Sequence, residues 1–115
     1  MAKKKSIITK WMDYCMICSK PVEEIHHALY GSKHKLADED LLLMPLCREH
    51  HNFSKKSVHM NPEMKILSQQ LAEACWERYY LAEKLTESNL GHQSADDWVE
   101  EARNAFKTRY GEYYM

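Results

Sequence analysis

The sequence predicts a small α+β protein in which a short, turn-rich region precedes two amphipathic helices. Two observations carry this prediction. Six of the seven histidines and three of the four cysteines fall within residues 14–60, among turns and short apolar runs. From residue 61 onward, apolar side chains recur at the spacing that places them on one face of a helix. We therefore divide the chain into a basic, partly disordered lead-in (1–13), a Cys/His-rich region (14–60) and a helical region (61–115).

Local signals mark the ends of both helices. Asn61 is a capping residue, and the Pro and Glu that follow it suit the first turn of a helix expected to run to about residue 86. Ser94 with Asp97 three residues later resembles a capping box, and Gly111 ends the second apolar stripe. These two helices either pack on the Cys/His-rich region or present an apolar face to a second copy or another protein.

Composition and charge exclude several classes of protein. With 115 residues, 44% hydrophobic and 29% charged, the chain is neither disordered nor membrane-embedded, since no apolar run approaches the ~18 residues that span a bilayer. The first residues lack the apolar stretch of a secretory signal, so we expect a cytoplasmic protein. The net charge is −1, but residues 1–65 carry 11 Lys/Arg against 8 Asp/Glu and residues 66–115 carry 5 against 9. This distribution leaves room for a phosphate-binding face on the first half.

Two pairs of metal-ligating residues have matching spacing. Cys15 and Cys18 form a C-x2-C pair, and Cys47 and His50 form a C-x2-H pair. Each pair suits a tight turn that directs two ligands at one ion, and four such ligands are what tetrahedral zinc requires. The 28 residues between the pairs are long enough for a β-hairpin. We predict a structural zinc site. The alternative is that the two pairs are buried cysteines that share this spacing by chance. Cys75 has no partner at ligand spacing, and we interpret it as a buried thiol that binds no metal.

Three further histidines are surplus to a four-ligand zinc site. His26 and His27 are consecutive, and His51 directly follows the last proposed zinc ligand. On a strand, consecutive side chains point to opposite faces, so one histidine can bind a cation while the other faces a substrate. A neutral imidazole is also a natural base for deprotonating water near pH 7. The alternative is that these histidines only pack beside the zinc site, as in modules that bind without catalysing.

The order of these motifs resembles the HNH nucleases, also called ββα-metal or His-Me finger nucleases, in their zinc-knuckle subtype. The resemblance lies in residues 15–18, 25–27 and 45–52, with 58–61 and 105–114 similar to small phage-encoded members. It implies a zinc-stabilised ββα-metal, treble-clef-like motif. It also implies a bacterial host cell and metal-dependent hydrolysis of DNA phosphodiester bonds.

The resemblance also implies roles for individual residues. His26 and His51 take the places of ligands to one divalent cation, Mg²⁺ or Mn²⁺, and His27 takes the place of the general base. His59 is either a third ligand, a phosphate contact or a surface residue. The products expected are 5′-phosphate and 3′-hydroxyl ends.

One position departs from the family pattern. The family's middle Asn, which orients the base, is replaced here by Leu42. Asp38, Asp40 or a backbone carbonyl must then orient His27 if the chain is active.

Short lysine runs flank the proposed cation site. Lys33 and Lys35 follow the histidine pair, and Lys55 and Lys56 follow the second zinc pair. These lysines are either phosphate contacts or ordinary solvated loop residues. His34, which lies between Lys33 and Lys35, is expected to be an exposed residue. Because no basic recognition helix is visible, DNA binding with little sequence specificity is expected.

The sequence thus predicts a small endonuclease that hydrolyses DNA. The alternative is a non-catalytic zinc-binding module that uses the same fold to bind nucleic acid or a partner protein. The helical region offers a surface for a homodimer or another protein in either case.

Overall fold

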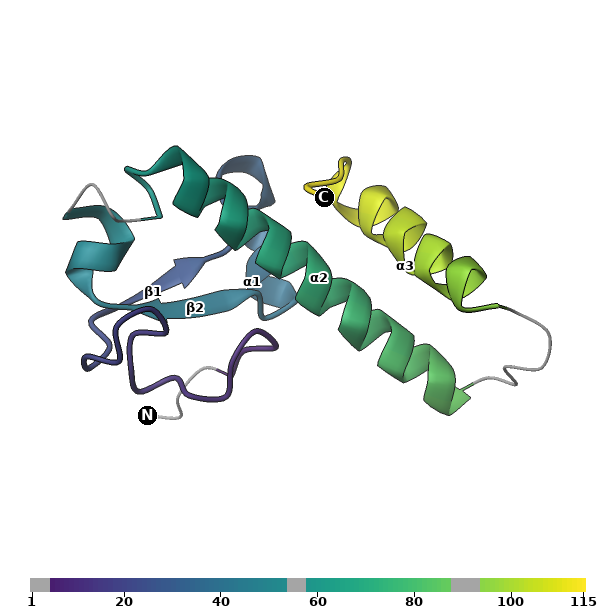
Figure 1. Ribbon diagram of the computed structural model, residues 1–115, viewed down its shortest axis with the longest axis horizontal. Helices are drawn as coiled ribbons and strands as arrows, with labels where there is room; N and C mark the ends of the chain where they lie inside the picture. Colours follow the sequence, from purple (N-terminus) through teal and green to yellow (C-terminus); the bar gives the residue numbers. More distant parts are fainter. Residues whose placement is uncertain (1–4, 54–57, 88–93) are drawn as a thin grey trace.

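The computed structural model describes residues 5–53, 58–87 and 94–115 (Figure 1). Within them the chain forms two short strands, β1 (Glu24–His27) and β2 (Leu43–Leu46), and two long helices, α2 (Pro62–Glu87) and α3 (Ala95–Tyr110). The shorter segments are the 3-10 turn η1 (Gly31–Lys33), α1 (His34–Glu39) and the π-helical segment η2 (Glu49–Phe53). The predicted α+β class is confirmed.

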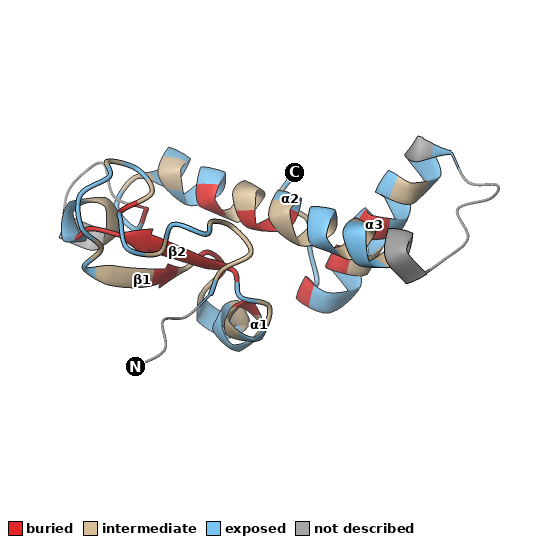
Figure 2. Ribbon diagram, turned by 90° about the horizontal axis from the view of Figure 1, so that it is seen from below, coloured by how far each residue is buried: buried red, intermediate tan, exposed pale blue. Residues whose placement is uncertain are grey.

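The two strands form one antiparallel pair. His26 lies opposite Met44 and His27 opposite Leu43, and β2 is buried along its whole length (Figure 2). The connection between the strands contains η1 and α1, which the sequence analysis did not predict. A six-residue helix has too few apolar positions to show a helical period. This inserted helix places Asp38 where its side chain reaches β1.

Hydrogen bonds join part of the lead-in to the sheet. The Ile7 N–H donates to the Leu41 carbonyl at 3.0 Å, and the Ser6 hydroxyl donates to the Leu43 carbonyl at 2.6 Å. These bonds attach the lead-in to β2 and to the turn before it, where the sheet edge leaves backbone acceptors unpaired. The expectation of partial disorder over residues 1–13 stays a prediction. The first four residues lie outside the described ranges.

The helix ends follow the predicted signals. The Asn61 side chain accepts from the N–H groups of Glu63 and the following residue, at 2.9 and 3.1 Å. Ser94 and Asp97 form a reciprocal capping box, and Gly111 ends α3 in the left-handed conformation with φ 86°. The predicted starts of both helices and the end of the second are confirmed.

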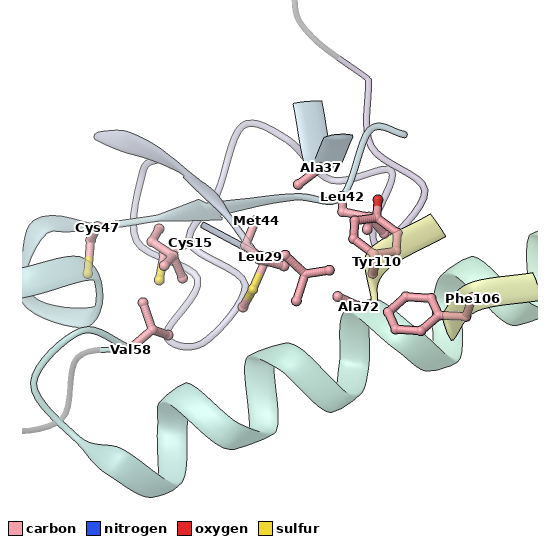
Figure 3. Packing of buried hydrophobic residues seen from close by; sticks show 12 residues of the cluster. Cys15, Leu29, Ala37, Leu42, Met44, Cys47, Val58, Ala72, Phe106 and Tyr110 are labelled. Atoms are coloured by element: carbon pink, nitrogen blue, oxygen red, sulfur yellow. The ribbon is translucent and has the colours of Figure 1, made fainter. Parts of the chain in front are cut away.

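The helices pack on the Cys/His-rich region through one continuous core. The core runs from Cys15, Cys47 and Val58 at one end to Phe106 and Tyr110 on α3 at the other (Figure 3). At that far end Asp40 accepts hydrogen bonds from the side chains of three residues: Trp76 at 3.0 Å, Arg109 at 2.6 Å and Tyr110 at 2.5 Å. Among the described residues, no helix is both long and apolar enough to cross a membrane.

Candidate metal centres

The first centre is a pair of tight turns. The Ser19 N–H donates to the Cys15 carbonyl at 2.8 Å, with Ser19 itself in the left-handed conformation at φ 66°. On the other side, Cys47 ends β2, and the His50 N–H donates to the Cys47 carbonyl at 3.2 Å. Each turn therefore holds two ligand side chains on the same side of the backbone. The four ligand atoms of Cys15, Cys18, Cys47 and His50 all lie within 4.8 Å of one another.

The separations in this centre fit a tetrahedral metal ion. Metal–ligand bonds of about 2.0 Å to nitrogen and about 2.3 Å to sulfur place tetrahedral ligands roughly 3.3–3.8 Å apart. The Cys18 and Cys47 sulfurs are 3.7 Å apart, and His50 Nδ1 lies 3.7 Å from the Cys15 sulfur and 3.2 Å from the Cys47 sulfur. These four residues, which the sequence analysis predicted as ligands, can therefore bind one metal ion.

Electrostatics at the sulfurs favour a bound cation. Burial opposes ionisation of Cys15, but backbone hydrogen bonds from Cys47, Cys18 and Ile17 outweigh it and lower the pKa of the Cys15 thiol to about 6. Burial and the neighbouring sulfurs of Cys18 and Cys15 raise the pKa of the Cys47 thiol. A metal cation relieves this crowding because it allows every thiol to ionise.

The second centre consists of three histidines from separate segments. His26 lies on β1, His51 on η2, and His59 in the turn before α2. One nitrogen from each lies within 4.8 Å of the others, and the Nε2 atoms of His51 and His59 are 3.0 Å apart. Two facing imidazole nitrogens so close cannot both carry a proton, so at least one presents a lone pair.

The protonation of these histidines also suits a cation. Burial, followed by the positive charges of His59, His51 and His27, lowers the pKa of His26 to about 3, so this buried imidazole is neutral. Its Nε2 has no hydrogen-bond partner among the described residues. Glu24 accepts from Nδ1 of His51, which leaves Nε2 of His51 as the ligating atom. A metal ion would satisfy the unpartnered nitrogen of His26.

The two centres lie next to each other, because His50 belongs to the first and His51 to the second. No known protein family, curated protein or solved structure matches this chain. Donor type separates the two centres, since the first offers mainly sulfur and the second only nitrogen.

His27 lies outside both clusters. Its Nε2 is 2.9 Å from Oδ1 of Asp38 on α1, and its side chain is 15% exposed. His34, expected to be an ordinary exposed residue, lies against it with ring centres 3.8 Å apart. The Asp38 carboxylate fixes one ring nitrogen of His27 as the donor and leaves Nδ1 to accept a proton. Leu42, where the resemblance to HNH nucleases would place an Asn, is fully buried.

The four lysines predicted to contact phosphate have different surroundings in the structure. Lys33 Nζ donates to the Tyr114 hydroxyl at 2.8 Å and pairs with Glu112 at 3.1 Å, so the C-terminal segment engages it. Lys35 is exposed. The remaining two predicted contacts, Lys55 and Lys56, lie outside the described residues.

Sequence reasoning missed two residues of the second centre. The Tyr30 ring lies 4.9 Å from the His59 ring, and Lys65 Nζ lies over Tyr30. Burial, the positive charge of His51 and that of Lys65 lower the pKa of His59, while Glu24 opposes them. No motif identifies Tyr30 or Lys65, because the fold alone brings the residue before η1 and the first turn of α2 to the centre.

Proposed function

We propose that this protein is a metal-dependent endonuclease of the HNH type that hydrolyses DNA phosphodiester bonds. The observation that carries this proposal is the convergence of His26, His51 and His59 beside a separate Cys/His cluster. A purely structural zinc module needs only the Cys/His cluster, so it gives no reason for a second set of ligands. The resemblance of the motifs to HNH nucleases points the same way.

We assign zinc to Cys15, Cys18, Cys47 and His50. Three sulfurs and one nitrogen at tetrahedral separations suit zinc better than magnesium or manganese, which prefer oxygen ligands. All four positions are filled by protein, so this zinc stabilises the fold and takes no part in the reaction. The antiparallel pair, with zinc ligands on its two flanking turns, supports the treble-clef-like reading.

The three histidines would hold the second cation, Mg²⁺ or Mn²⁺. When bound, this cation neutralises charge that develops on the phosphate and the leaving oxygen. Imidazole ligands are more typical of zinc, copper, iron and nickel, so Mg²⁺ or Mn²⁺ is the cation that the resemblance to HNH nucleases implies. Glu24 orients His51 for this role, and the buried β1 position keeps His26 neutral.

His27 is the proposed general base. Its alternation with His26 along β1 separates ligand from base, and Asp38 holds its ring in one orientation through Nε2. Nδ1 then takes the proton from the attacking water. Asp38 supplies the orientation that the family draws from the Asn that Leu42 replaces. The expected substrate is DNA bound with little sequence specificity, in a phage-infected bacterial cytoplasm.

Cleavage of supercoiled plasmid with Mg²⁺ or Mn²⁺ tests this function, comparing the native protein with His27→Ala. We expect nicked or linear DNA from the native protein and a loss of about 10²- to 10⁴-fold in rate for the variant. Tyr79→Phe, a change at an exposed residue of α2, is the matched control and should cleave as the native protein does. Circular dichroism and zinc content verify that each variant is folded and zinc-replete.

Two results would contradict the proposal. Equal cleavage by the native protein and His27→Ala would mean a different base or a contaminating nuclease. No cleavage with either metal, on supercoiled, linear and single-stranded DNA, would favour the non-catalytic zinc module and direct the search to nucleic-acid or protein partners.

A further inference from the structure

Lys65 brings a positive charge to the three-histidine centre. It lies in the first turn of α2, exposed, with its Nζ 5.6 Å from the ring centre of Tyr30. The same Tyr30 ring lies 4.9 Å from the ring of His59 and 5.6 Å from the ring of His26. In Figure 1 the start of α2 lies at the same end of the sheet as η2, which carries His51. One aromatic ring therefore connects the lysine to two of the three histidines.

This charge is available to a ligand. Within residues 5–53, 58–87 and 94–115, no carboxylate lies within ion-pair distance of Lys65, whereas Lys33 is engaged by Glu112. Glu63 lies two positions earlier on α2, so it faces a different side of the helix. Glu24, the carboxylate at the centre, is already bonded to His51. A free ammonium group beside a cation site repels the cation, and an anion that contacts both removes the repulsion.

The helix itself offers little to such an anion. A free helix N-terminus attracts anions through unpaired N–H groups. Here Asn61 already accepts from the N–H groups of Glu63 and the following residue. The attraction for an anion at this end of α2 therefore comes from the Lys65 side chain.

We propose that Lys65 binds a phosphate oxygen of the DNA strand held at the three-histidine centre, with Tyr30 positioning the lysine. The proposal deepens the endonuclease function and rests on it. A phosphodiester has two free oxygens, so one can face the cation site while the other accepts from Lys65. Because the contact is with the backbone, it adds affinity without sequence preference.

Salt-dependent DNA binding tests this contact in a His27→Ala background, with Mn²⁺ and a short duplex. Adding Lys65→Ala should lower the slope of log K against log salt by about 0.9, the value for one phosphate contact. The affinity advantage of Lys65 should then shrink roughly threefold to fourfold between about 50 and about 200 mM salt. Lys65→Arg should restore most of the slope. Lys84→Ala, which removes a lysine 5.5 Å from the ring centre of Tyr80 on the same helix, should leave it unchanged.

Calorimetric titration with Mn²⁺ in the absence of DNA separates a phosphate contact from a structural role. Lys65→Ala should bind Mn²⁺ at least as tightly as the native protein, since a repelling charge is removed. Weaker Mn²⁺ binding, an unchanged salt slope, or no DNA binding by the native protein would each overturn the proposal. If Lys65 governs the slope but no DNA is cleaved, the phosphate contact stands and the endonuclease function fails. If DNA is cleaved but the salt slope does not depend on Lys65, the endonuclease function stands and the phosphate contact fails.

Discussion

The two metal-competent centres are neighbours, yet they differ in closure. In the first, two of the four ligands, Cys15 and Cys47, are almost fully buried, and short turns from both flanks of the sheet enclose the site. In the second, His26 is buried but His59 is exposed. The first centre offers four candidate ligand atoms, and the second offers three, with one accessible side.

This difference distinguishes a site suited to stabilising the fold from a site suited to binding a substrate. A closed site has no position for a substrate, whereas a cation on three protein ligands keeps positions for water and phosphate. The backbone joins the centres at His50 and His51, so folding around the first fixes one ligand of the second. The comparison therefore predicts a one-way dependence: losing the first centre removes the second, but losing the second leaves the first intact.

The largest effect is expected from Cys47→Ser. A structural zinc contributes roughly 10–16 kcal/mol of apparent free energy, comparable with the roughly 5–15 kcal/mol total stability of a domain. We expect the variant to lose zinc, cooperative unfolding and binding of the second cation together. Zinc content by mass spectrometry and thermal melts by circular dichroism measure this. Cys75→Ser, which changes a cysteine outside the cluster, should keep both. A folded Cys47→Ser protein that still binds Mn²⁺ would break the one-way dependence.

His51→Ala tests the other direction. It removes one of three ligands, so Mn²⁺ affinity should fall by at least about tenfold to hundredfold, the cost of losing even an orienting partner of a ligand. Zinc content and the far-ultraviolet spectrum should stay native. His34→Ala, which changes an exposed histidine outside the cluster, controls for loss of an imidazole. Loss of zinc in His51→Ala would mean that the two clusters form one site.

Asp38→Ala tests whether the two neighbouring histidines of β1 have different roles, His26 as a metal ligand and His27 as the base. If Asp38 acts by orienting His27, as proposed, the cleavage rate should fall about tenfold to hundredfold with Mn²⁺ affinity and DNA binding unchanged. Asp38→Glu should recover part of the rate, which a loss of folding would not permit. Glu39→Ala removes the neighbouring carboxylate, which pairs with Arg109, and should retain the native rate. A matching loss in both variants would mean a general effect of charge.

Local features were predictable from the sequence, and long-range placements were not. Cys15 and Cys18 lie on one turn, and Asn61 caps the helix it precedes, so spacing alone identifies them. The contact of Asp38 with His27 depends instead on α1, a helix too short to show a period. The contacts of Lys33 with Glu112 and Tyr114 join positions about 80 residues apart in the chain. Such contacts arise from the packing of elements, which composition and spacing do not encode.

A third cluster of ionisable groups consists of the carboxyl groups of Glu73 and Glu77. Here a proton, and not a metal ion, would reduce the repulsion. Glu73 on α2 is fully buried, and its Oε1 accepts from the N–H groups of Tyr114 and Met115 at 2.6 and 3.2 Å. Burial and the negative charge of Glu73 raise the pKa of Glu77 to about 7, against the opposing charge of Arg103. Below pH 7 a bound proton therefore relieves the repulsion between the two carboxyl groups.

The smallest effect is expected from Glu77→Gln, measured by thermal or urea unfolding at several pH values. Because the pKa of Glu77 is higher in the folded protein than its ordinary value of 4.5, the folded state binds more protons between these two values. Stability from this group is thus full below about pH 4.5 and declines as pH rises to about 7. Since Glu77 is partly exposed, the loss is about 1–2 kcal/mol rather than the full value of the shift.

Glu77→Gln should therefore be the more stable protein at pH 8 and should lack this decline, while Glu100→Gln on α3 keeps it. A stability difference between the native protein and Glu77→Gln that is the same at pH 5 and pH 8 would contradict the raised pKa of Glu77.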